Sequence, residues 1–367
     1  MTHLNKFTNI SIVHEVDEYA LKKPKLIGAG FDGLDVDGVL CDKIMKTNPV
    51  TVYSNNDVRF VFQGAAGKGV FVNEDGEVIH QFLGGDSSIF ESAESEKRIK
   101  GKTFLLGRPN SKKFYYHWVV DDLARLGYLK DAGYRLDEFD NFLMMAEPNK
   151  WQAETLVKAG VDLNKIVVVK DLEAVTCDEF FHIEAGNGMG LKMNRRIPSY
   201  LNSLFSHQSE SEVKDRVKLY VSRPKNGNRS IEGEEHYTQL LEQNGFTITT
   251  LDGLNVQEQV DLFRRADVVV APHGGALTNL VYCRPGTQVV EIFGRHVYPF
   301  YYGLSELCGL DYHAILEDES DLRCLVNFAE AKGRQGNHRQ SMKLPIVFEA
   351  DKLVDFFGFN SASEKVA

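Results

Sequence analysis

The second half of the chain alternates strand-like and helix-like segments, and this alternation constrains the fold more than any other feature of the sequence. Residues 267–271 form a run that is apolar throughout after Asp267, as expected of a strand that is buried on both faces of a parallel sheet. Two glycines follow, and Leu277, Leu280 and Val281 then recur at helical spacing. Such alternation over residues 218–316 predicts a Rossmann-like α/β unit.

One helix of this unit has a clear start signal. Asn255 is followed three residues later by Glu258, which predicts a capping box. The segment that follows carries Val256, Val260 and Phe263 on one stripe. The other predicted elements are strands at 218–223, 247–251, 288–293 and 311–316, and helices at 232–244, 301–308 and 351–358.

The first half is expected to be richer in strands. Residues 1–105 contain short strand and turn signals, and the charged stretch 86–102 predicts a solvated loop or a surface helix. Helix and strand signals then alternate and predict parallel βαβ units. The predicted strands are 58–62, 69–73, 78–82, 141–146 and 165–170, and the predicted helices are 114–132 and 150–159. The composition changes between residues 185 and 217, where we place a domain junction.

Composition narrows the class of protein. The chain has 367 residues, 43% hydrophobic and 26% charged, which suits two packed domains. Its net charge of −10 argues against a nucleic-acid partner, because such a partner requires a basic surface. Five cysteines without a CxxC pair predict reduced thiols in a cytoplasmic protein rather than disulfides or a zinc site. We expect no membrane span and no signal peptide.

Two motifs near the start of the chain fit their usual structural context poorly. Gly28, Gly30 and Gly33 spell GxGxxG, but neither a full strand before them nor a helix after them is evident. Asp35 and Asp37 resemble the aspartyl-phosphate motif of haloacid-dehalogenase-type phosphatases, yet glycines occupy the place of its buried strand. A turn with solvated carboxylates is the favoured interpretation, and a phosphohydrolase stays an alternative.

The candidate ligand-binding residues follow the strands of the second half, because open α/β sheets bind ligands at the carboxyl ends of their strands. Arg223 and Arg229 lie in the loop after the first of these strands, and their guanidinium groups suit phosphate oxygens. Residues 272–276 combine two glycines with the start of a helix, whose N–H groups favour a diphosphate. Glu291, at a strand end, is a candidate to accept hydrogen bonds from ribose hydroxyls.

Several segments form a recognisable set in their order along the chain. They are residues 114–118 with Asp121, Arg125 and Leu126, then Ile197 with Pro198, then residues 219–223, 258–260, 262–267, 272–280, 285–287 and 291–292. As a set they resemble glycosyltransferase family 61. Gly275 departs from the family's pattern, since an alanine is expected there in an HGA motif, and residues 1–105 carry no part of the resemblance.

The resemblance implies a GT-B fold, in which two Rossmann-like domains face a cleft, here with a β-rich N-terminal extension. The expected division is an acceptor-side domain at 1–195, a nucleotide-sugar-binding domain at 215–345, a helix at 346–358 that crosses back, and a disordered tail at 359–367. The implied reaction is inverting transfer of a sugar, for example xylose or N-acetylglucosamine, from a nucleotide sugar. The donor is commonly UDP-linked, and the acceptor is a hydroxyl of a glycan or glycoprotein.

The implied reaction needs groups that bind the donor and a base that activates the acceptor. The expected donor-binding residues are Ser222, Arg223, Arg229, His273, Gly274, Gly275, Ala276, Asn279 and Glu291. No DxD motif stands at a strand end of the second half, so we expect no metal and no other cofactor. For the base that accepts the proton of the acceptor hydroxyl, His117 is the first candidate. Asp121 lies four residues later on the same helix face, where it either orients the imidazole or is itself the base.

The sequence leaves several alternatives open. A nucleotide-sugar epimerase or hydrolase on the same scaffold competes with the transferase, and a noncatalytic binder of sugar nucleotides is a weaker option. The donor sugar, the nucleobase, the acceptor, the linkage and the oligomeric state do not follow from the sequence.

Overall fold

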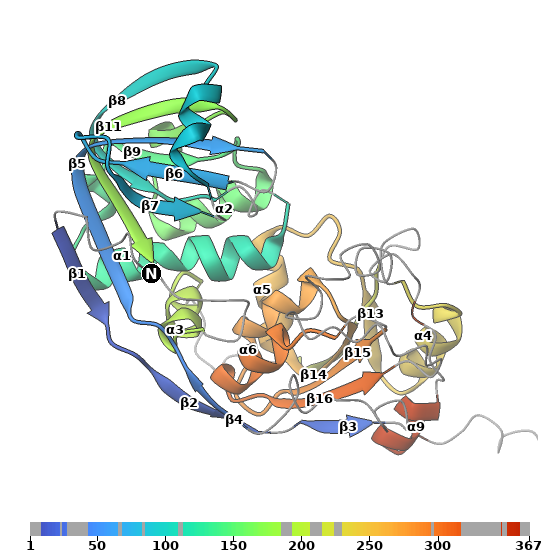
Figure 1. The fold of residues 1–367 in the computed structure, drawn as a ribbon. Helices are drawn as coiled ribbons and strands as arrows, with labels where there is room; N and C mark the ends of the chain where they lie inside the picture. Colours follow the sequence, from blue (N-terminus) through green and yellow to red (C-terminus); the bar gives the residue numbers. More distant parts are fainter. Residues whose placement is uncertain are drawn as a thin grey trace, which may run out of the picture. The chain divides into compact units, whose positions relative to one another are not determined.

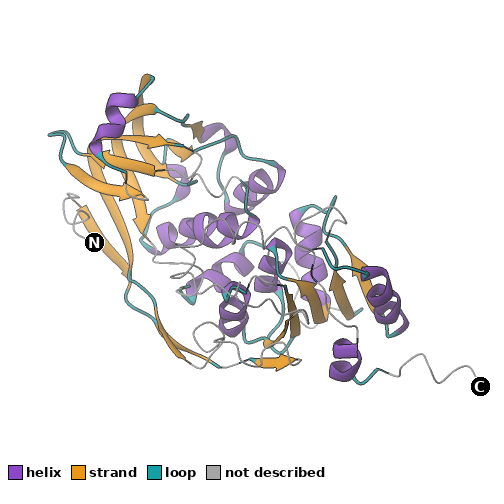
Figure 2. Cartoon of the chain, turned by 45° about the vertical axis from the view of Figure 1, so that its right-hand side comes forward, coloured by secondary structure: helices purple, strands orange, loops and turns teal. Residues whose placement is uncertain are grey.

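The computed structural model describes residues 9–22, 24–27, 43–64, 68–82, 85–108, 113–184, 193–205, 215–223, 230–294, 297–316, 346 and 351–359. The chain divides into two compact units, each a mixture of helices and strands (Figures 1 and 2). Unit 1 comprises Met1–Glu18, Lys46–Gly188 and Lys192–Phe205, and unit 2 comprises Tyr19–Met45, Met189–Leu191 and Ser206–Ala367. Residues 19–45 therefore belong with the C-terminal part of the chain, although the sequence analysis grouped them with the N-terminal domain.

Unit 2 is built on a six-stranded sheet in the order β13-β12-β14-β15-β16-β3, and its neighbouring strands are parallel. The strands are β12 (Val217–Val221), β13 (Phe246–Thr249), β14 (Ala266–Pro272), β15 (Gln288–Phe293), β16 (Asp311–Leu316) and β3 (Lys25–Ile27). The direction of chain progress reverses between β12 and β14. In open α/β sheets, ligands bind outside the carboxyl ends of the strands at such a reversal, so the loops after β12 and β14 occupy the expected binding position.

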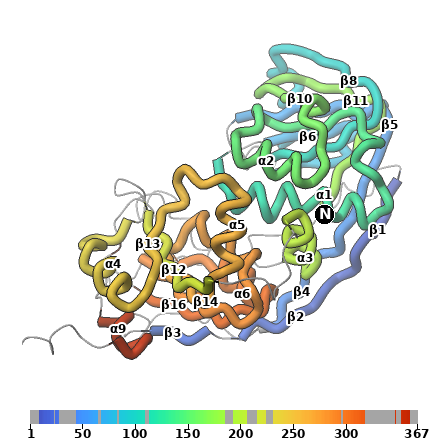
Figure 3. Tube along the Cα trace, turned by 180° about the vertical axis from the view of Figure 1, so that it is seen from behind, coloured from blue at the N-terminus to red at the C-terminus, as the bar shows by residue number. Residues whose placement is uncertain are grey.

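Helices connect the strands of unit 2 in the predicted alternation. They are α4 (Glu234–Gln243), α5 (Val256–Arg265), the 3-10 helix η11 (Gly275–Tyr282) and α6 (Phe300–Cys308). The chain can be followed from β12 through α4 to β13 and α5 in Figure 3. The predicted capping box of α5 is confirmed, because Asn255 Oδ1 accepts from the Glu258 amide at 2.9 Å and Glu258 Oε2 accepts from the Asn255 amide at 2.7 Å.

The C-terminal helix and the edge strand of unit 2 both pack onto its sheet. Leu353 of α9 (Asp351–Phe357) is fully buried in an apolar cluster with Val270 and Ile315. The expected return of this helix to the first domain stays a prediction. The edge strand β3 pairs with β16, and Tyr302 Oη donates to the Lys22 carbonyl at 2.6 Å.

Unit 1 contains an eight-stranded mixed sheet in the order β10-β9-β8-β11-β5-β6-β7, with β1 (Asn9–His14) also paired to β5. Its strands are β5 (Val50–Gln63), β6 (Lys68–Val72), β7 (Val78–Phe82), β8 (Ser95–Leu105), β9 (Asn141–Met144), β10 (Ile166–Val168) and β11 (Glu173–Glu184). β8, β9, β10 and β11 pair in parallel, whereas β5, β6 and β7 form an antiparallel meander. The Rossmann-like expectation therefore describes only the parallel part of unit 1.

Side-chain alternation along β5 explains how this sheet is buried. Phe60 and Phe62 face one apolar cluster together with Phe180 of β11. Val61 faces the opposite side, where Ile89 of the 3-10 helix η4 (Ser87–Ser92) packs. This two-residue period is the signature of a strand covered on both faces.

The structure corrects two expectations for unit 1. Residues 95–102 belong to β8 rather than to a loop or surface helix. The error arose because the first half of β8 is exposed and charged, while Ile99 alone among its first six residues is buried. The sequence analysis also did not identify β11, a strand of 12 residues at the centre of the sheet.

The helix expected at residues 114–132 is present, but its first part is a π-helix, His117–Leu123, which continues into α1 (Ala124–Asp131). π-helical turns are rare and often occur at functional sites. After β9, α2 (Lys150–Ala159) has the predicted bounds and begins with a capping box between Asn149 and Gln152. Two short strands, β2 (Glu18–Leu21) and β4 (Lys43–Lys46), form a separate pair.

Candidate active site

In unit 2 the loops after β12 and β14 contact one another directly. Arg223 follows β12, and its Nη1 donates a hydrogen bond to the carbonyl oxygen of His273 at 2.6 Å. Since β12 and β14 are adjacent parallel strands, with Tyr220 opposite Val270, their carboxyl ends lie at one edge of the sheet. Arg223 and His273, which the sequence analysis placed in two converging loops, are therefore in direct contact, whereas their role in binding a donor stays a prediction.

Gly274 makes this convergence possible because it has no side chain. A Cβ at this position would lie 2.2 Å from Arg223 Nη1 and 3.0 Å from its Cζ, far inside van der Waals contact. The requirement is one of space, since the Gly274 φ of 171° is ordinary extended backbone. Gly275 and Ala276, which begin η11, are partly exposed.

The His273 imidazole is bonded to buried Glu291, which is bonded in turn to buried Tyr312. Its ring is 4% exposed, its Nδ1 shares a hydrogen bond with Glu291 Oε1, and Tyr312 Oη donates to Glu291 Oε2 at 2.5 Å. Burial, followed by the Glu291 charge, raises the pKa of Tyr312 well above its usual value, so this hydroxyl remains a donor. Both oxygens of the fully buried Glu291 are thus engaged, and the predicted contact with a ribose would require one of these bonds to break.

The other sequence-predicted donor residues have different surroundings. Ser222 Oγ donates to Glu234 Oε2 at 2.9 Å, while Tyr220 Oη donates to the other oxygen of Glu234 at 2.7 Å. Asn279 is fully buried and donates to Gln259 Oε1 at 3.0 Å. Arg229 lies outside the described residues. Sequence reasoning missed Glu234, although an acidic residue in the first turn of the helix after a candidate loop is a usable signal.

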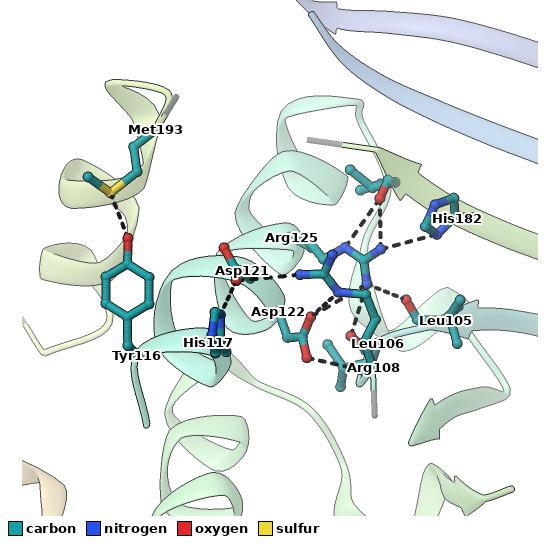
Figure 4. A network of polar contacts seen from close by, with 11 residues as sticks. Leu105, Leu106, Arg108, Tyr116, His117, Asp121, Asp122, Arg125, His182 and Met193 are labelled. Carbon is teal, nitrogen blue, oxygen red and sulfur yellow. Dashed lines mark hydrogen bonds and ion pairs between the residues drawn. The ribbon is translucent and has the colours of Figure 1, made fainter. Parts of the chain in front are cut away.

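In unit 1, His117 and Asp121 form a hydrogen-bonded pair on the π-helical turn. His117 Nδ1 and Asp121 Oδ2 are 2.7 Å apart (Figure 4). The His117 side chain is 39% exposed, whereas that of Asp121 is 13% exposed. When Nδ1 carries the proton and donates to Asp121, Nε2 keeps a lone pair that can accept a proton. The geometry therefore suits His117 as the base and Asp121 as the group that orients it.

A buried arginine lies one helical turn beyond this pair. Arg125 donates to the carbonyl oxygens of Leu105 and Leu106 at 3.1 Å each and to that of Ile183 at 2.8 Å (Figure 4). Its Nη2 is also 3.1 Å from His182 Nδ1. Arg125 appears in the sequence motif, but its role in joining the helix to the ends of β8 and β11 could not be inferred there.

Some expectations cannot be examined in the structure. The GxGxxG segment at residues 28–33 and the acidic pair Asp35 and Asp37 lie outside the described residues. Within the described residues, no group of three or more histidine, cysteine, aspartate or glutamate side chains is arranged to hold a metal ion. In the same part of the chain, every helix is too short or too polar to cross a bilayer.

Comparison with known proteins agrees with this geometry. Residues 115–290 match the family model Glycosyltransferase 61. The chain is also similar to Beta-1,2-xylosyltransferase RCN11 of Oryza sativa subsp. japonica, with 27% identity over 143 residues, or 38% of this chain and 24% of that protein. The chain thus matches about a quarter of the length of this curated relative. Residues 115–290, which contain both the His117–Asp121 pair and the contact between Arg223 and His273, thus match glycosyltransferase family 61.

Proposed function

We propose that the chain catalyses inverting transfer of a sugar from a UDP-linked donor to a hydroxyl of a glycan or glycoprotein, without a metal ion. The observation that carries this proposal is the contact between Arg223 and the His273 carbonyl over Gly274. In the proposed GT-B arrangement, unit 2 binds the donor and unit 1 supplies the base. The unpaired thiols Cys177, Cys283 and Cys308 are compatible with the proposed cytoplasmic location.

Unit 2 would stabilise the leaving diphosphate with charge and with main-chain dipoles. The Arg223 guanidinium places a positive charge beside the first residues of η11, where N–H groups at a helix start favour anions. Arg229, from the same loop, would add a second positive charge. Such preorganised donors stabilise the negative charge that develops on the diphosphate as the glycosidic bond breaks.

The chemical step then requires a base opposite the leaving group. His117 Nε2 accepts the proton of the acceptor hydroxyl, whose oxygen forms a bond to the anomeric carbon. The bond from that carbon to the diphosphate oxygen breaks, and UDP leaves with the electron pair. Asp121 stabilises the imidazolium that forms. A single displacement of this kind inverts the anomeric centre.

The family relative guides the choice of sugar. The rice protein is named as a β-1,2-xylosyltransferase, so UDP-xylose is the first donor to test, followed by UDP-N-acetylglucosamine.

Two substitutions test the assignment by separating binding from catalysis. His117→Ala should lower turnover by roughly 100-fold or more while UDP affinity, measured by calorimetry, persists. Arg223→Ala should weaken UDP affinity. Arg216→Ala is a matched control, because Arg216 pairs with Asp267 near the opposite end of the same strands. Equal UDP affinity in the native chain and Arg223→Ala would contradict the donor site, and sugar release or epimerisation without an acceptor would favour the competing activities.

A further inference from the structure

Arg108 links the end of strand β8 to the helix that carries the candidate base. It lies three residues after Leu105, the last residue of β8. Its main-chain N–H donates to Asp122 Oδ2 at 3.1 Å, and its Nε donates to Asp122 Oδ1 at 2.9 Å. Asp122 is fully buried. Because a buried carboxylate is costly unless it is paired, this double contact fixes the position of Arg108.

Arg125 braces the same carboxylate from the other side. Its Nη1 lies 3.9 Å from Asp122 Oδ1, and its remaining donors are engaged by carbonyl oxygens at the ends of β8 and β11. Burial, with a smaller contribution from the Arg108 charge, lowers the pKa of Arg125 to about 9. The guanidinium is therefore still charged at neutral pH, and Asp122 lies between two cations.

The other end of Arg108 faces the catalytic pair. Its Nη2 is 3.8 Å from Asp121 Oδ2, the oxygen that is bonded to His117 Nδ1 (Figure 4). Asp121 Oδ1 is buried and makes no hydrogen bond within the described part of the chain. A buried carboxylate oxygen without a donor is destabilising, and a cation at this distance offsets part of that cost.

We propose that Arg108 is a positioning residue for the His117–Asp121 pair: anchored by Asp122, it places a fixed positive charge beside the Asp121 carboxylate and so holds Asp121 in the orientation in which its Oδ2 meets His117 Nδ1. The catalytic consequence rests on the proposed function, but the placement of Asp121 does not.

The test is an NMR comparison of the histidine ring signals in the full chain, with the His117 signals assigned by their loss in His117→Ala. In Arg108→Gln the His117 ring signals should shift, because Asp121 loses the cation that holds it, and Arg108→Lys, which keeps the charge, should restore most of the native spectrum. Arg135→Gln is the matched control, since Arg135 is an exposed arginine of unit 1 paired with Asp137 at 3.0 Å, and it should leave the His117 signals unchanged.

Kinetics provide the second readout. We expect Arg108→Gln to lower kcat by roughly tenfold or more with UDP affinity unchanged, and Arg108→Lys to recover part of kcat. If Arg108→Gln does not fold, Asp122→Asn tests the same arrangement, because it keeps the arginine but weakens its anchor and should lower kcat in the same way. Native His117 ring signals in folded Arg108→Gln, or native kcat in Asp122→Asn, would overturn the proposal. Unchanged turnover in His117→Ala would instead refute the proposed base, and the NMR comparison would still decide the role of Arg108.

Discussion

At the scale of single residues, the site in unit 2 depends on the absence of a Cβ atom at Gly274. Gly274 leaves room for the Arg223 guanidinium to reach the main chain, and the His273 carbonyl fixes one end of that group. An arginine held in this way loses less side-chain freedom when it binds an anion than an arginine in a mobile loop.

We therefore expect Gly274→Ala to weaken UDP binding by roughly tenfold or more, because displacing Arg223 removes a charge-assisted contact worth about 1.5–3 kcal/mol. Calorimetric titration with UDP measures this change. The double variant Gly274→Ala with Arg223→Ala should bind UDP no more weakly than Arg223→Ala alone. Full additivity of the two losses would show that Gly274 does not act through Arg223.

The sequence identified Arg223 and His273 as neighbours because the carboxyl ends of adjacent parallel strands share one edge of a sheet. It did not identify the bonds that join Glu291 to His273 and Tyr312, nor the partners of Arg108. Those contacts depend on the directions in which packed side chains point. The spacing of residue types along the sequence does not reveal these directions.

At the scale of elements, the sequence predicts features that neighbouring residues determine, and it does not predict strands that depend on partners far along the chain. The capping box of α5 involves residues three apart, so the sequence contains all of it. By contrast, β8 and β11 are strands because each pairs with neighbours far along the chain. The first half of β8 is mostly exposed and charged, so its sequence lacks the alternation of apolar and polar residues that predicts a strand.

Two neighbouring histidine rings, partly buried His80 in β7 and buried His182 in β11, are expected to make unit 1 sensitive to acid. The His80 ring in β7 lies 5.0 Å from that of His182 in β11 and 4.5 Å from that of Phe82. Burial, with a smaller contribution from the Arg125 charge, lowers the pKa of His80 to about 4. Burial also lowers the pKa of His182. Both rings are therefore neutral in the folded chain at physiological pH.

The unfolded chain binds a proton at His80 below about pH 6.5, whereas the folded chain binds it only near pH 4. Stability that is fully present above about pH 6.5 is therefore lost as the pH falls toward 4, and His80 alone should account for about 2 kcal/mol by pH 5. Urea unfolding followed by tryptophan fluorescence measures this in unit 1, which contains both tryptophans, Trp118 and Trp151.

In His80→Phe we expect a smaller loss of stability between pH 7 and pH 5, since the group that titrates is gone and the new ring still packs among aromatic side chains. His236→Gln, which changes an exposed histidine of unit 2, is the control. Equal pH dependence in His80→Phe and the native chain would show that this pair is not the acid-sensitive element.

At the scale of the whole molecule, we propose that unit 2 alone binds the donor. UDP at a hundredfold excess over its Kd should stabilise the unit that binds it by about 2.7 kcal/mol. We expect this shift in calorimetric unfolding of the native chain and not of Arg223→Ala, and the tryptophan transition, which reports unit 1, should move less. EDTA should leave the shift unchanged, whereas loss of UDP stabilisation on chelation would contradict metal-independent binding.

The edge strand β3 has a consequence for how the protein is made. Residues 25–27 leave the ribosome almost 290 residues before the β16 edge against which they pair. The nascent sheet of unit 2 therefore stays incomplete while most of unit 1, residues 46–188 and 192–205, is synthesised between β3 and β16. A fragment that starts after residue 205 would present β16 as an open border with nothing to cover it, and such a border invites association with other chains.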